Sequence, residues 1–148
     1  MRDRPFLNCN FLVDLGTGTT DGAEAGFQEI SPIALEVTVA EYRNGNEKEN
    51  NPRLLTGATK SGTVTLRRGI IGAGNLYAWI DPIRNGDQNA LRTVLITLVS
   101  EDHATVVQRW KLLRARPVRV AAGPFHAQAT EIAIEELVLA YERLEIEV

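Results

Sequence analysis

The sequence predicts a mostly β protein, an antiparallel sandwich or partly open barrel of about seven strands with one short α-helix. Several segments alternate apolar and polar side chains, which is the pattern of a strand with one buried face. Glycine and asparagine cluster between these segments, where turns need them. The chain has 148 residues, and we expect a single domain over residues 1–148.

In the first half we expect strands at residues 6–14, 27–31, 35–42 and 63–68. The third of these places Leu35, Val37 and Val39 on one face, so the alternation predicts a half-buried strand. We expect it to form a hairpin with residues 63–68.

The helix is predicted by the spacing of Leu76, Trp79, Ile80 and Ile83, which recur at i, i+3, i+4 and i+7. Asn75 is a suitable cap for its start. Proline breaks or kinks a helix, so Pro82 limits the prediction to residues 76–81.

In the second half, residues 92–99 and 105–112 read as a hairpin, followed by an extended piece at 115–120. The last segment, residues 131–144, is ambiguous. Its composition favours a helix, but tertiary pairing often overrides propensity.

Composition excludes several function classes. The net charge of −3 gives no basic excess for nucleic acid, and no stretch approaches the length of a membrane span. The single cysteine, Cys9, cannot form an internal disulfide, and we expect it to be a small buried residue. Neither His103 nor His126 has metal-ligand spacing, so we expect no metal, no cofactor and no enzyme activity.

The connection over residues 43–57 is too long for a tight hairpin. It is rich in charges and amides, as a solvated loop would be, but it also contains Leu54 and Leu55. Composition leaves a solvated loop and a functional loop both open.

The same region carries a family resemblance. In order along the chain come Gly26-Phe27-Gln28-Glu29-Ile30-Ser31, Tyr42-Arg43, Leu54-Leu55-Thr56-Gly57 and Val64-Thr65-Leu66-Arg67-Arg68-Gly69, and later Trp110, Ala115, Pro117 and Arg119. This order and spacing resembles the tail-tube protein family of contractile bacteriophages and extracellular contractile injection systems. The family usually has an aromatic residue where this chain has Arg116.

The resemblance implies a structural subunit that forms hexameric rings stacked into a hollow inner tube. It also implies that residues 131–144 form the closing strand, and that two hairpins per subunit join around the ring. The implied partners are further copies of the chain, sheath, baseplate and tube-terminator proteins, and a DNA or protein cargo that passes without specific binding. Such a protein is made in the bacterial cytoplasm and then built into the particle, with no membrane anchor. A monomeric β-barrel that binds a small ligand is the alternative.

Two sets of residues are expected to carry the assembly. We expect ring-stacking or subunit contacts at Tyr42, Arg43, Glu47, Lys48, Glu49, Arg53, Leu54 and Leu55. Alternation along the two expected hairpins predicts a polar wall of mixed charge facing the lumen, formed by Glu36, Thr38, Thr63, Thr65, Arg67, Thr93, Thr97, Thr105 and Arg109. The opposite faces are expected in the core: Val37, Val39, Val64, Leu66, Val94, Ile96, Leu98 and Trp110.

Overall fold

The structure, a computed structural model of the chain, describes residues 4–18, 26–46, 48, 51–128 and 130–148 and confirms a mostly β fold with one short helix. Its described elements are, in order, β1 (Phe11–Asp14), β2 (Glu29–Ile30), β3 (Leu35–Tyr42), β4 (Arg53–Ser61), β5 (Thr63–Gly69), α1 (Asn75–Arg84), β6 (Arg92–Val99), β7 (Val106–Ala122), β8 (Ile134–Ala140) and β9 (Arg143–Glu147). No helix in these ranges is long and apolar enough to cross a membrane.

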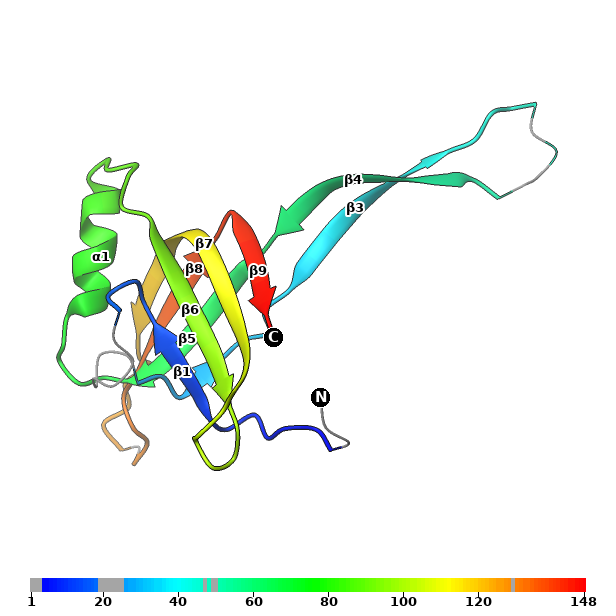
Figure 1. The fold of residues 1–148 in the computed structure, drawn as a ribbon. Coiled ribbons are helices and arrows are strands. Elements are labelled where there is room, and N and C mark those ends of the chain that lie inside the picture. The colour runs from blue at the N-terminus through cyan, green and yellow to red at the C-terminus, as the bar shows by residue number, and fades with distance from the viewer. Residues whose placement is uncertain (1–3, 19–25, 47, 49–50, 129) are drawn as a thin grey trace.

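Two antiparallel sheets share the long strand β7 (Figure 1). The first sheet has the order β1-β6-β7-β9, and the second has the order β7-β8-β5-β2. The N-terminal part of β7 pairs with β6 and β9, and the part from Arg116 onward pairs with β8. Between these parts, Arg114 has a φ of 52°. The described strands form a sandwich whose sheets do not close into a barrel.

The hydrophobic core lies between the two sheets. Val64 and Leu66 of β5 meet Val94 and Ile96 of β6 there, as the alternation predicts. Helix α1 adds Leu76 and Trp79, and the indole Nε1 of Trp79 donates a hydrogen bond to the carbonyl of Ala90 at 3.0 Å. Burying Trp79 therefore leaves its polar atom satisfied.

A buried arginine joins β5, β8 and α1. The side chain of Arg68 is 1% exposed, and its Nε lies 2.5 Å from Oε1 of Glu135. A second guanidinium nitrogen donates to the side-chain oxygen of Asn75. The prediction that Asn75 caps α1 is therefore wrong. The cap position is Gly74, which makes no side-chain cap hydrogen bond.

Strands β3 and β4 form a separate two-stranded hairpin, which we call the arm, and Figure 1 shows it leaving the body. The predicted pairing of residues 35–42 with residues 63–68 is therefore wrong. Residues 53–61 form a strand of their own, which pairs with β3 in place of residues 63–68. The predicted loop of 43–57 is therefore shortened to residues 43–52. The arm has no core: all of β3 is exposed, including Val37 and Val39, which were expected to be buried.

The base of the arm is fixed to the body by hydrogen bonds. The backbone amide of Thr65 donates to Oγ of Ser31 at 2.8 Å, and the amide of Ser31 donates to the carbonyl of Thr65 at 2.9 Å. The hydroxyl of Tyr141 donates to the carbonyl of Ala34 at 3.0 Å. At the other side of the base, β4 continues into β5 through Gly62 alone.

Several element boundaries differ from the prediction. Strand β1 begins at Phe11, the first residue that pairs with β6, rather than at residue 6. Strand β2 has only two residues, Glu29 and Ile30, instead of the predicted 27–31. Helix α1 runs to Arg84 and contains Pro82. Proline removes a hydrogen bond from the helix interior, but here the last turn is completed by Asn85 N donating to Asp81 O at 3.3 Å.

In the C-terminal half, two predicted strands are joined into one, and one predicted strand is divided into two. Residues 106–112 and 115–120 belong to one 17-residue strand, β7, and Thr105 lies in the turn before it. The predicted strand of 131–144 is instead two strands, β8 and β9, because the chain turns at Tyr141 and Glu142 to reach the other sheet. Cys9 is exposed rather than buried.

Candidate assembly surfaces

The arm has an apolar face and a more polar face. Paired residues of two strands point to the same side, and successive residues point to opposite sides. Val37 is paired with Thr59, Val39 with Thr56, and Glu41 with Leu54. The apolar face is therefore Leu35, Val37, Val39 and Leu54, all exposed, with Leu54 reaching 66%.

The other face of the arm carries charged and polar groups. Glu36 is paired with Lys60, and Tyr42 is paired with Arg53. The hydroxyl of Thr38 donates to the carbonyl of Ala58 at 2.8 Å, beside the irregularity in register between Val37 and Val39. Leu55, paired with Ala40, is the large aliphatic side chain exposed on this face. The described residues leave the apolar face uncovered.

The predicted contact residues lie on the arm or its connection. Tyr42, Arg53, Leu54 and Leu55 are exposed on β3 and β4, and Arg43 and Lys48 are exposed between them. Glu47 and Glu49 lie outside the described residues. The Tyr42 hydroxyl forms a hydrogen bond with the side-chain oxygen of Asn44, which holds the end of β3.

The structure divides the predicted lumen residues among three places. Glu36 and Thr38 lie on the polar face of the arm. On the first sheet, Arg109 is paired with Thr97 and covers it, with Arg109 Nε 3.4 Å from Thr97 Oγ1. Thr93 lies on the same face, and Thr105 is exposed in the turn before β7.

The third group, Thr63, Thr65 and Arg67, lies on the outer face of the second sheet. Arg67 lies 3.7 Å from Glu29 and 3.9 Å from Glu136 on that face. Since Val64 and Val94 share the core, the polar faces of β5 and β6 point away from each other. The body therefore does not bring this group together with Thr93, Thr97 and Arg109.

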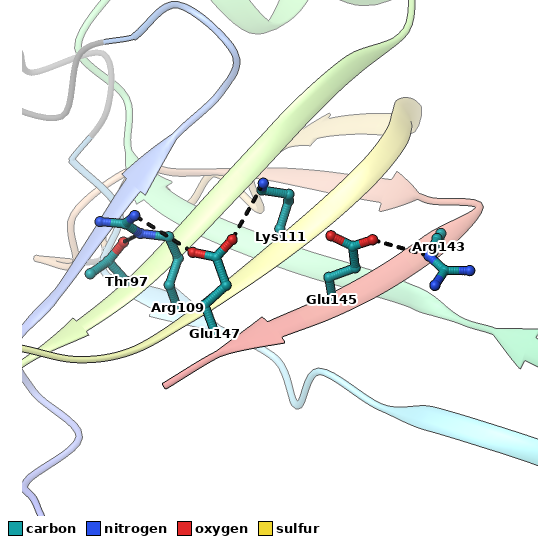
Figure 2. A network of polar contacts seen from close by, with 6 residues as sticks. All are labelled: Thr97, Arg109, Lys111, Arg143, Glu145 and Glu147. Atoms are coloured by element: carbon teal, nitrogen blue, oxygen red, sulfur yellow. Dashed lines mark hydrogen bonds and ion pairs between the residues drawn. The ribbon is translucent and has the colours of Figure 1, made fainter.

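The outer face of the first sheet also holds charged residues that the sequence reasoning missed, shown in Figure 2. Glu147 forms ion pairs with Arg109, at 3.8 Å, and with Lys111, at 3.4 Å, while Arg143 lies 3.2 Å from Glu145. The signal was the alternation of Arg143, Glu145 and Glu147, which continues past residue 144, where the predicted strand ends.

The turn between β6 and β7 holds the side chains that most resemble a catalytic cluster. Ser100 donates to Asp102, Ala104 N donates to Asp102 at 3.0 Å, and these bonds hold the pKa of the Asp102 carboxyl below its usual range. These hydrogen bonds stabilise the turn, because the side-chain oxygens of Ser100 and Asp102 bond to groups within the turn itself. Within the described ranges no group of three or more His, Cys, Asp and Glu side chains could hold a metal ion.

Comparison with known proteins identifies the fold and the family. The family model described as T4-like virus tail tube protein gp19 matches residues 7–145. The chain belongs to this tail tube family. Searching proteins with curated functions gives no significant match.

Among solved structures, the tail tube family fold is found in contractile injection systems. A chain of the PVC sheath-tube complex in the extended state has a TM-score of 0.85 at 23% identity, covering 98% of this chain and 93% of that one. A chain of the anti-feeding prophage baseplate, 6-fold symmetrised, has a TM-score of 0.83 at 26% identity, covering 99% and 97%. Hcp1 from Flavobacterium johnsoniae has a TM-score of 0.54 at 11% identity, covering 93% and 94%.

Proposed function

We propose that this tail tube protein is a structural, non-enzymatic subunit whose copies form hexameric rings, and that the rings stack into the hollow inner tube of a contractile tail or injection system. The observation that carries this is the arm: a hairpin with an exposed apolar face and no core of its own. Such a hairpin is marginal alone in water. A neighbouring copy that covers the apolar face would stabilise it.

Covering the apolar face is worth several kcal/mol. Fully burying a valine or leucine side chain contributes about 1.5–3 kcal/mol, and those of the arm are already about half covered. Four of them would contribute on the order of 3–6 kcal/mol per arm. We place Leu54 within this contact and Tyr42, Arg43, Glu47, Lys48, Glu49 and Arg53 at its rim, since interfaces keep polar groups at the rim. Leu55 is paired with Ala40 on the opposite face of the arm, so a contact there would need a second neighbouring surface.

We assign the wall of the bore to the outer face of the first sheet. A barrel that continues around a ring needs an unpaired strand at each side of every subunit's sheet. The first sheet ends in β1 and β9, of four and five residues, whereas the second is bordered by the two-residue β2. The wall then consists of Thr93, Thr105 and Arg109, joined by Glu36 and Thr38 of the arms, while Thr97 is buried beneath Arg109. Thr63, Thr65 and Arg67 would line the bore only if the second sheet formed it.

The relatives suggest the partners. The similar chains come from a sheath-tube complex, a baseplate and a tube-terminating cap. We propose that this tube likewise contacts a sheath, a baseplate and a terminator, and passes a DNA or protein cargo without binding it specifically. The subunit would be made in the bacterial cytoplasm and then built into a phage tail or related particle.

Electron microscopy of concentrated protein and of the native particle tests this proposal. We expect hexameric rings or tubes, and a map with Thr93 and Arg109 toward the lumen. The variant Leu54→Asp/Leu55→Asp should keep its fold by circular dichroism and fail to form tubes. A monomer at every concentration, together with a native particle that lacks rings, would rule the proposal out.

A further inference from the structure

The long strand β7 is basic along most of its length. It carries no carboxylate and five basic side chains, which are Arg109, Lys111, Arg114, Arg116 and Arg119. The whole chain has a net charge of −3, so this strand differs from the rest of the sequence. A row of arginine and lysine side chains along one element is the electrostatic pattern that binds the phosphates of nucleic acids. Strand β7 alone would therefore attract such a polyanion.

The C-terminal segment is acidic and lies along this basic strand. Residues 134–147 contain five glutamates and one basic residue, and they pair with β7 through β8 and β9. Three of the glutamates lie within ion-pair distance of all five bases of β7, in the pairs Glu147 with Arg109 and Lys111, Glu142 with Arg114 and Arg116, and Glu136 with Arg119. The segment thus acts as an internal counterion for the strand.

On the outer face of the first sheet, Figure 2 shows this pairing residue by residue. One carboxylate oxygen of Glu147 lies 3.8 Å from Arg109, and the other lies 3.4 Å from Lys111. Beside them, Arg143 of β9 lies 3.2 Å from Glu145. Three bases against two carboxylates leave one positive charge among these side chains, whereas all three positive charges would remain without the carboxylates.

The ion pairs of this face contribute little to the folding of the subunit. Their side chains are between 31% and 65% exposed, and exposed ion pairs add little stability because water screens them and side-chain entropy opposes them. Their effect is on the electrostatic potential of the surface. Fixed charges of opposite sign that lie closer together than the Debye length, about 8 Å at physiological ionic strength, largely cancel for a charged molecule that passes over them.

We propose that Glu145 and Glu147 prevent the wall of the bore from holding nucleic acid. This inference rests on the proposed function, which places the outer face of the first sheet in the bore, and it adds the residues that let a cargo pass. Nucleic acids bind basic surfaces chiefly by releasing counterions from their phosphates. A phosphate that approaches Arg109 or Lys111 must instead displace a carboxylate that is fixed in place, so each contact gains less.

Glutamine substitution in assembled tubes tests the inference. Tubes of the variant Glu145→Gln/Glu147→Gln and of the unchanged protein are mixed at low salt with a fluorescent oligothymidylate, and then with a nuclease coupled to beads that cannot enter the bore. We expect the variant to retain roughly tenfold more protected oligonucleotide. Its affinity should fall with salt with a logarithmic slope of about −2 or steeper, from roughly 0.7 for each of three freed bases.

A matched control removes two carboxylates from the other sheet. Glu29 and Glu136 lie 3.7 Å and 3.9 Å from Arg67 on the outer face of the second sheet. The variant Glu29→Gln/Glu136→Gln therefore changes the net charge by the same amount, and we expect it to protect no more oligonucleotide than the unchanged protein. Equal protection by both variants would overturn the inference, because net charge alone would then explain the retention.

A rescue variant tests whether the freed bases are the binding groups. Adding Arg109→Gln/Lys111→Gln to Glu145→Gln/Glu147→Gln should return retention to that of the unchanged protein. If the glutamine variant forms no tubes alone, tubes assembled from equal parts of variant and unchanged subunits give the same measurement. Tubes that retain no extra oligonucleotide, or that keep it in the rescue variant, would overturn the inference and leave the proposed function intact. If the unchanged protein formed no rings at all, the proposed function itself would fail.

Discussion

The arm and the body use the same strand pattern and bury it differently. Strand β3 places Val37 and Val39 on one face, and β5 places Val64 and Leu66 on one face. The valine and leucine of β5 are fully buried, whereas those of β3 are about half exposed. Alternation therefore states that a strand has an apolar side, but it does not state which chain covers that side.

The comparison also separates two kinds of stability. The body holds its core within one chain, so its side chains determine whether the subunit folds. Among the described residues nothing packs above the apolar face of the arm, so under the proposed function its side chains would determine whether subunits assemble. Matched substitutions in the body and in the arm can separate the two kinds of stability.

The largest effect is expected at the buried ion pair of the body. Glu135→Ala removes the carboxylate that faces Arg68, which is 1% exposed, and should lower the free energy of unfolding by about 3–5 kcal/mol. The matched change on the arm, Glu36→Ala opposite Lys60, should shift it by no more than about 0.5 kcal/mol. Urea unfolding of both variants measures this. Equal small effects would show that Arg68 does not depend on Glu135, and Arg68→Met with Glu135→Leu should recover much of the loss.

Leucine truncation compares packing in the two regions directly. Leu66→Ala should cost about 2–5 kcal/mol of unfolding free energy, because it leaves a cavity in the core. Leu54→Ala should change unfolding by about 0.5 kcal/mol or less, because the side chain is exposed, yet reduce tube formation. Thermal unfolding of subunits and turbidity during assembly check the two halves. A large loss of subunit stability in Leu54→Ala would remove the distinction.

A smaller effect is expected where the arm joins the body. Tyr141→Phe removes the hydrogen bond to the carbonyl of Ala34 and should cost about 1 kcal/mol. We also expect faster amide exchange in residues 32–42, with the core strands unchanged. Uniformly faster exchange across the chain would mean that Tyr141 supports the core and does not anchor the arm.

The smallest effect concerns the turn between β6 and β7. The hydrogen bonds from Ser100 and Ala104 favour the ionised Asp102 carboxylate. In the folded protein they lower the pKa of this carboxyl below its ordinary value of 3.8. This contribution is present above pH 3.8 and is lost as the pH falls through the lower folded value. The difference in melting temperature between the unchanged protein and Asp102→Asn should therefore shrink below pH 3.8. A difference that stays constant with pH would contradict this.

The sequence predicted the body better than the arm, and for a physical reason. Val64, Leu66, Val94 and Ile96 are buried by the chain itself, so local alternation was enough to place them. The pairing partners of the strands were harder to predict. The sequence of residues 53–61 has the composition of a loop, and these residues form a strand because they pair with β3. The lumen set could not be placed as a unit, since alternation gives a face to each strand and says nothing of which sheet that strand joins.

At residues 131–144, local propensity and the family resemblance predict different secondary structures. Its glutamates and leucines favour a helix, and only the resemblance indicated a strand. The break at Tyr141 was invisible to both, because it depends on β9 crossing to the first sheet to pair with Leu112 and Leu113. The charged face of β9 was missed for the same reason.

The single-residue link between β4 and β5 determines how a pull on the arm enters the molecule. Gly62 leaves no slack, so tension along β4 continues along the axis of β5. Strand β5 pairs with β8 over seven residues from Thr63 to Gly69, and its hydrogen bonds there lie across the direction of the load. They bear it together in shear, whereas a load at right angles would open them one at a time. If the arm carries the contact between copies, tension on that contact would therefore be resisted within each subunit by the whole length of the β5–β8 pairing.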